Sequence, residues 1–98
     1  MRLESLRLVV PAAPGNGTAQ LVRDLSNKYV QIGGGAFTGS LTIEVSLNGG
    51  VDFAQTGAAI TAPGIVVVPE PATHVRVVTG SLSAGTPTAT IAGHLRDD

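Results

Sequence analysis

The sequence contains no cysteine and no tryptophan, and only one tyrosine and two phenylalanines among its 98 residues. Without cysteine the chain can form neither a disulfide framework nor a thiolate metal site. With so few aromatic rings, the hydrophobic core must consist mainly of valine, leucine, isoleucine and alanine. A chain of this length forms one domain with a modest core.

Charge is also scarce. Charged residues make up 13% of the chain, and six basic and seven acidic residues give a formal net charge of −1. Nucleic-acid backbones and anionic lipids are bound by clustered lysine and arginine, so we expect neither a nucleic-acid partner nor a membrane partner. Low charge with many hydrophobic residues favours a surface that other subunits partly cover. The alternative is a stable monomer with a threonine-rich surface.

Long apolar runs are missing as well. No stretch approaches the ~18 apolar residues of a membrane span. The first residues, MRLESLRLVVPAAPG, lack the apolar core of a secretory signal because Glu4 and Arg7 interrupt them. We therefore expect the protein to be made in the cytoplasm.

What the sequence does contain is short alternation of apolar and polar residues between glycine and proline turns. This pattern predicts an all-β fold, an antiparallel β-sandwich or jelly roll of about eight short strands. We expect residues 1–17 to form an N-terminal strand or arm with a Pro/Gly linker, and 18–98 to form the sandwich domain. The predicted strands cover residues 6–10, 18–24, 27–32, 41–47, a segment from 51, 65–68, 73–79 and 88–92.

The clearest hairpin signal is the segment SLNGGVDF. A three-residue turn ending in a left-handed Gly50 would place Leu47 opposite Val51 and Val45 opposite Phe53, which keeps the apolar residues on one face. We therefore predict a type I turn with a G1 bulge, and Phe53 in the core.

Further local predictions concern the C-terminal half. TAPG predicts a turn with a positive φ at Gly64, followed by a strand over 65–68 that is buried on both faces. In the next strand Val75 and Val77 should face inward, and His74 and Arg76 outward. We expect a loop over SLSAGTP, inward-facing Ala89 and Ile91, and a frayed LRDD tail.

Groups that could carry chemistry are few. His74 and His94 have no partner at metal-ligand spacing, and the sequence has no nucleophile elbow and no distinctive carboxylate pair. We expect no metal, no cofactor and no enzymatic activity. The glycines of IGGGAF precede a strand instead of a helix, so they indicate a strand-to-strand loop and not a phosphate site. Binding of a sugar would have to use Tyr29 or Phe37 as the aromatic platform.

Four segments resemble small β-sandwich proteins of tailed-bacteriophage virions: KYVQIGG, FTGSLTIEVSLNGGVDF, APGIVVVPEPATHVRVV and GTPTATIAG. In that family a G-x-x-x-I-E-x-S-x-[DN]-G hairpin precedes a proline-led Val-Arg-Val strand. The chain is also similar to discoidin-type jelly rolls, which bind carbohydrate or lipid, but it lacks their tryptophans and their aromatic or basic loops. The resemblance covers roughly residues 18–93. The matching positions are Gly39, Ile43, Glu44, Ser46, Asn48, Gly49, Phe53, Pro71, Val75, Arg76 and Val77.

Among these virion proteins, the chain is most similar to head decoration (cement) proteins, both in its size and in its lack of tryptophan and of distinctive binding loops. The resemblance therefore implies a structural virion protein on the outer capsid surface, made in the host cytoplasm. Its partners would be the major capsid protein and other copies of itself, with a trimer favoured, and weak contacts would sum through multivalency. The alternatives are a glycan- or receptor-binding module and a minor tail or baseplate subunit.

The expected contact residues lie mainly at the N-terminus. That segment could act as an arm or added strand that pairs with another chain, or equally be the first strand of the sandwich. Phe37, in the IGGGAF loop, is a second contact candidate. The N-terminal candidates are Arg2, Leu3, Leu6, Leu8 and Val10.

Overall fold

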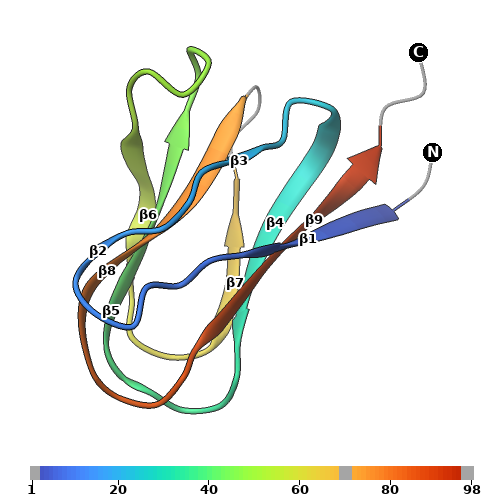
Figure 1. Ribbon diagram of the computed structural model, residues 1–98. Coiled ribbons are helices and arrows are strands. Elements are labelled where there is room, and N and C mark those ends of the chain that lie inside the picture. The colour runs from blue at the N-terminus through green and yellow to red at the C-terminus, as the bar shows by residue number, and fades with distance from the viewer. Residues whose placement is uncertain (1–2, 69–71, 96–98) are drawn as a thin grey trace.

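The chain folds as two antiparallel β-sheets packed face to face, as Figure 1 shows for the computed structural model, which describes residues 3–68 and 72–95. The β-sandwich predicted from the sequence is therefore confirmed. The first sheet has the strand order β1 (Leu3–Leu8), β9 (Thr88–Leu95), β4 (Leu25–Gly33) and β7 (Gly64–Val67). The second has the order β2 (Gly15–Asn16), β8 (His74–Ala84), β5 (Thr38–Ser46) and β6 (Ala54–Ile60), and β3 (Gln20–Leu21) also pairs with β8.

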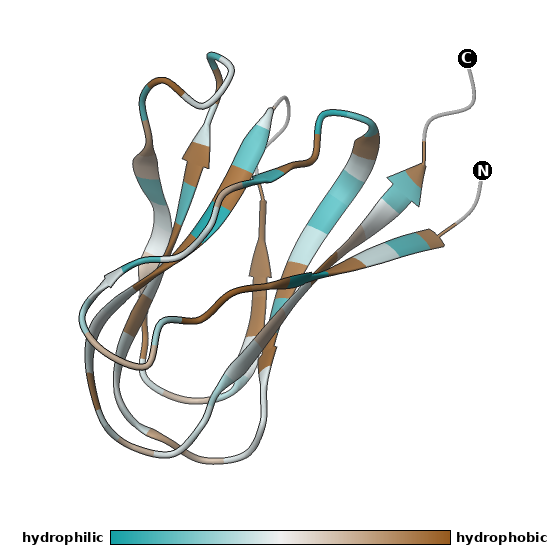
Figure 2. Ribbon diagram, viewed as in Figure 1, coloured by the Kyte–Doolittle hydropathy of each residue, from teal (hydrophilic) through white to brown (hydrophobic). Residues whose placement is uncertain are grey.

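The core lies between the sheets and is almost entirely aliphatic. The alternation predicted for the long strands is confirmed, because alternate residues of β4, β5, β8 and β9 are buried between the sheets. Figure 2 shows where hydrophobic residues lie along these strands. The apolar side chains of these four strands that are at most 1% exposed are Val30, Ile32, Leu41, Ile43, Val75, Val77, Ala89 and Ile91.

The turn after β5 is longer than predicted. Val45 pairs with Ala54, not with Phe53, so seven residues connect the two strands, and Leu47 and Val51 are 61% and 77% exposed. The prediction maximised apolar pairing, but hydrogen bonds of the buried Ser46 determine the turn. Its Oγ accepts bonds from the backbone N–H groups of Asn48 (3.3 Å) and Gly50 (2.9 Å). The positive φ of Gly50 is confirmed at 88°.

The strand over 65–68 is not buried on both faces. Ile65 and Val67 are 68% and 61% exposed, because β7 is an edge strand whose outer side chains face solvent. The chain bends at Ala62 and Pro63, as predicted, but Gly64 is the first residue of β7 and does not have the positive φ that was predicted for it. An apolar run does not reveal whether both faces are covered.

Two other boundaries differ from the sequence prediction. β8 continues to Ala84, so the loop expected over SLSAGTP shrinks to residues 85–87. The strand expected over 18–24 is reduced to β3. Residues 96–98 of the expected tail, and Pro71 of the family motif, lie outside the described residues. No helix among the described residues is long and apolar enough to cross a membrane.

Candidate functional site

The predicted N-terminal contact segment is the edge strand β1. It pairs with β9 from Leu3 opposite His94 to Leu8 opposite Ala89. Leu3 and Leu6 are 68% and 40% exposed, whereas Leu8 is 2% exposed and belongs to the core. Val10 packs partly buried against that core, and Arg2 lies outside the described residues. Of the described candidates, Leu3 and Leu6 offer the most apolar surface to a partner.

Phe37 does not provide a surface contact. It is 9% exposed and belongs to the core. The loop over 85–87 lies against it, since a Cβ atom built on Gly85 would be 2.7 Å from the Phe37 Cα atom. The ring therefore closes one end of the sandwich and is not available to stack on a sugar.

An apolar cleft opens beside β1. It has a volume of about 300 Å³ and lies between β1 and the turn that joins β3 to β4. Two carboxylate residues, Glu4 and Asp24, line a wall that is otherwise aliphatic. The lining residues are Glu4, Leu6, Leu21, Val22, Asp24, Leu25 and Leu95.

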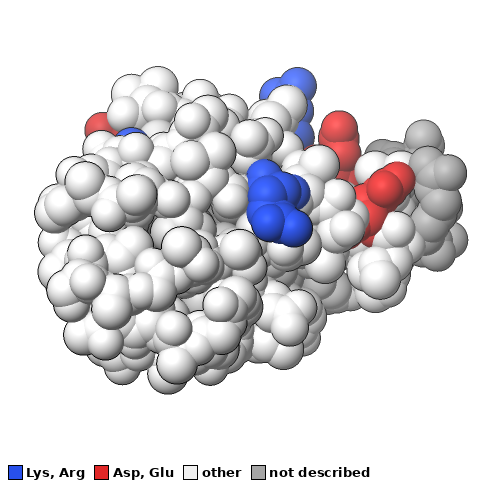
Figure 3. All heavy atoms as spheres, turned by 60° about the horizontal axis from the view of Figure 1, so that its bottom comes forward, with Lys and Arg blue, Asp and Glu red and all other residues white. Residues whose placement is uncertain are grey.

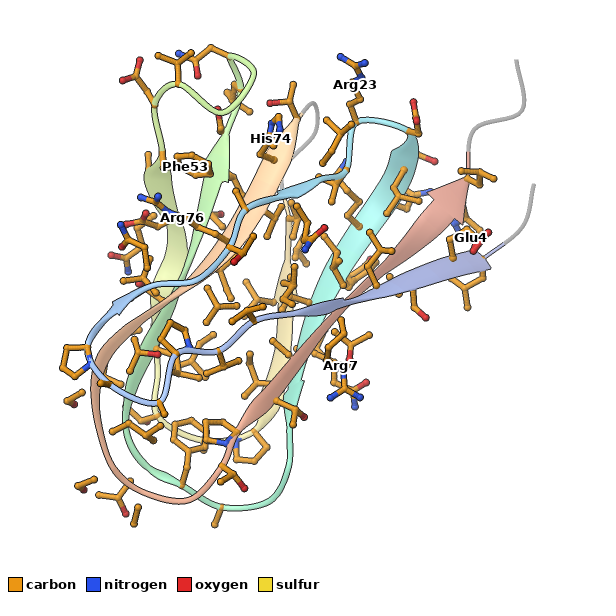
Figure 4. The ribbon with its side chains drawn as sticks, in the orientation of Figure 1. Glu4, Arg7, Arg23, Phe53, His74 and Arg76 are labelled. Carbon is orange, nitrogen blue, oxygen red and sulfur yellow. The ribbon has the colours of Figure 1, made fainter. Side chains whose placement is uncertain are left out.

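A polar and aromatic cluster lies on the outer face of the second sheet. Glu44 and Arg76 are directly opposite each other on β5 and β8, and the Glu44 Oε1 atom accepts bonds from Arg76 Nε (2.9 Å) and Nη2 (2.6 Å). The guanidinium carbon of Arg76 lies 4.0 Å from the centroid of the Phe53 ring (Figure 4). Phe53 is thus a half-buried surface residue and not the core residue that the sequence predicted.

The sequence predicted that Arg76 faces outward, but it did not predict the pairing of Arg76 with Glu44. That pairing depends on the register of β5 against β8, two strands that are distant in the chain. A hollow of about 230 Å³ adjoins the cluster. Its lining residues are Val45, Leu47, Asn48, Asp52, Phe53 and Ala54.

On the outer face of the first sheet, an aliphatic strip follows the edge strand β7. Tyr29 on β4 is directly opposite Val67 on β7, and Gln31 is opposite Ile65. Tyr29 is 49% exposed and, with Ile65 and Val67, forms a continuous exposed patch on adjacent strands. We call these three residues the β7 strip.

Among the residues that the structure describes, those at the end of the sandwich farthest from Leu3 and Leu95 carry no charge. The loops over 34–37, 61–63 and 85–87 lie at this end, and the linker over 9–14 approaches it (Figure 1). None of these segments contains lysine, arginine, aspartate or glutamate. Figure 3, turned so that this end comes forward, shows a broad area without charged side chains. We call these four segments the loop end.

One lysine is buried. Lys28 is 1% exposed, and its Nζ atom donates a hydrogen bond to the Leu25 carbonyl at 2.9 Å. The two histidines lie apart: His74 Nδ1 is 3.1 Å from Thr73 Oγ1, and His94 Nδ1 is buried without a hydrogen bond. Within residues 3–68 and 72–95, no three histidine or acidic residues cluster in a way that could hold a metal ion.

Compared with protein-family models, with curated proteins and with solved structures, the chain matches none.

Proposed function

We propose that the chain is a structural virion protein that decorates the head of a tailed bacteriophage and strengthens it through contacts across capsid subunits. The sequence resemblance motivates this role, and the loop end is the observation that supports it most. A decoration protein acts by covering a neighbouring surface, which requires an extended, accessible face and no reactive group.

The loop end has the properties of such a face. Its residues are mostly alanine, proline, glycine and threonine, which are small and leave the backbone accessible. The loops over 34–37 and 85–87 are packed against each other, since a Cβ atom on Gly34 would lie 2.6 Å from the Thr86 carbonyl oxygen. A surface that is already ordered loses little conformational entropy when it binds.

Each copy would contact the major capsid protein weakly, and copies joined as one unit, with a trimer favoured, would sum these contacts through effective concentration. The exposed Leu6 of β1, which lines the cleft beside that strand, offers a second contact surface away from the loop end. Two separate contact surfaces on one small domain are what a protein that joins neighbouring subunits requires.

Charge introduced at the loop end tests this proposal. We expect Ala62→Glu and Thr86→Glu, both at exposed positions, to reduce co-sedimentation with empty heads of the phage that encodes the chain at least tenfold, because each buries an unpaired carboxylate in the contact. The control is Val51→Glu, which is 77% exposed in the turn at the opposite end and should bind normally. Equal binding of all three variants would contradict the assignment of the loop end.

Two other roles use the same fold. A tail or baseplate subunit would co-purify with tails instead of heads. A glycan-binding module would use Tyr29, the half-exposed aromatic residue of the β7 strip. In that case the wild type would bind a sugar array and not phage heads, and Tyr29→Ala would abolish the binding to the array.

A further inference from the structure

The edge strand β7 lacks the features that protect the other sheet edges from pairing with another chain. Proteins protect such edges with charge, irregular geometry or very short strands. β1 carries Glu4 and Arg7, β6 contains a positive φ at Gly57 beside a register shift, and β2 and β3 have two residues each. The sequence of β7 is GIVV, which is uncharged and regular in its pairing.

The hydrogen-bond register shows which groups β7 offers to a partner. The Val68 N–H donates to the Lys28 carbonyl at 3.0 Å, in the same register that pairs Val66 with Val30. Residues of an antiparallel strand alternate between facing the neighbouring strand and facing away from it. The N–H and C=O groups of Ile65 and Val67 therefore point to the open edge of the sheet.

These groups are self-complementary about a two-fold axis through Val66. If β7 of a second copy aligns antiparallel, Ile65 of each copy faces Val67 of the other, and each such pair exchanges two hydrogen bonds, four in all. Because this two-fold axis is normal to the sheet, the outer faces of the first sheet of both copies lie on the same side of the joined sheet. The exposed side chains of Ile65 and Val67 from both copies then form one aliphatic strip, flanked by a Tyr29 from each copy.

We infer that β7 is a self-association edge, at which a second copy of this chain adds its own β7 and joins the two four-stranded sheets into one of eight strands. Proline has no N–H, and Pro63 and Pro69 bound the segment in the sequence, which limits the pairing to a short, defined stretch. This favours a discrete dimer over an extended fibre.

The size of the contact sets its strength. The β7 strip and its strand edge supply roughly a few hundred Å² per copy, below the ~800 Å² per partner of a standard interface. The dimer should therefore dissociate reversibly and be populated at high protein concentration, such as that on a crowded particle surface. The pairing requires no capsid, so its test is independent of the test of the decoration role.

Sedimentation velocity of the purified full chain, from micromolar to millimolar concentration, tests the inference. We expect the average mass of the wild type to rise toward that of a dimer. Val67→Lys should weaken dimerisation at least tenfold, because it places two like charges in the strip. The control Val51→Lys adds the same charge at a 77% exposed position outside the strip and should dimerise like the wild type.

Val67→Pro tests the backbone bonds separately. It removes an N–H that points to the open edge and that none of the described strands uses, so it eliminates two of the four intermolecular bonds. If this variant does not fold, as judged by circular dichroism, Val67→Lys decides alone. A wild type that stays monomeric at every concentration, or a dimer unaffected by Val67→Lys, would overturn the inference.

Discussion

At the scale of single residues, the glycines of the IGGGAF loop have distinct roles. Gly34 and Gly35 both have positive φ, 88° and 87°, which side chains disfavour. A Cβ atom on Gly34 would also lie 2.6 Å from the Thr86 carbonyl oxygen, whereas one on Gly35 would meet nothing within 4 Å. Gly34 is thus required by the close approach of two loops at the loop end.

This difference gives a matched pair of variants. Gly35→Ala should lower the free energy of unfolding by about 1 kcal/mol through backbone strain alone. Gly34→Ala should cost at least about 1 kcal/mol more, because the loop over 85–87 must also move. Urea denaturation of both proteins measures the difference. Equal losses would mean that the two loops are not in contact.

Lys28 shows what a sequence pattern can and cannot predict. Lys28 lies two residues before Val30 and four before Ile32, so strand alternation places it on the same inward face of β4. There it is 1% exposed. That signal was available in the sequence. Which acceptor satisfies a buried ammonium group depends on the local backbone, here the Leu25 carbonyl beside a residue with positive φ, Asn27 at 52°.

We expect Lys28→Ala to lower the free energy of unfolding by about 2–5 kcal/mol, because it removes a buried hydrogen bond and leaves a cavity. Lys28→Met should cost less, since it restores most of the volume. Arg23→Ala, at an exposed position in the turn before β4, is the control and should change the free energy by less than about 0.5 kcal/mol. Chemical denaturation would contradict the burial of Lys28 if Lys28→Ala behaved like the control.

At the scale of elements, alternation predicted the long strands well because period two is imposed by a core on one face. It located the inward residues of β4, β5, β8 and β9. It could not show that β7 lies at an edge, since the position of a strand in a sheet depends on pairing with distant residues. It also gave the wrong turn after β5, where hydrogen bonds of Ser46 and Asn48 outweigh apolar pairing.

The role of β1 can be tested at the same scale. If β1 is docked in the free protein, Leu8→Ala should cost about 2–5 kcal/mol, because the side chain is 2% exposed. Leu3→Ala, at 68% exposure, should cost less than about 0.5 kcal/mol. Thermal denaturation of both variants distinguishes a docked strand from an arm, for which both substitutions would be neutral.

At the scale of the whole molecule, the absence of charge from the loop end has a consequence for binding. Contacts between uncharged surfaces are not screened by salt, unlike those between charged surfaces. Binding to empty heads should therefore change less than about threefold between low salt and ~1 M salt. A steep loss of binding measured by co-sedimentation across that range would point to a charged contact surface instead.

If the protein decorates a phage head, as we propose, it is abundant there, and quantitative mass spectrometry of separated heads and tails tests this role. We expect the chain to be found with the heads, in a fixed and simple ratio to the major capsid protein. Its absence from purified particles, or its recovery with the tails in a few copies, would contradict the decoration role.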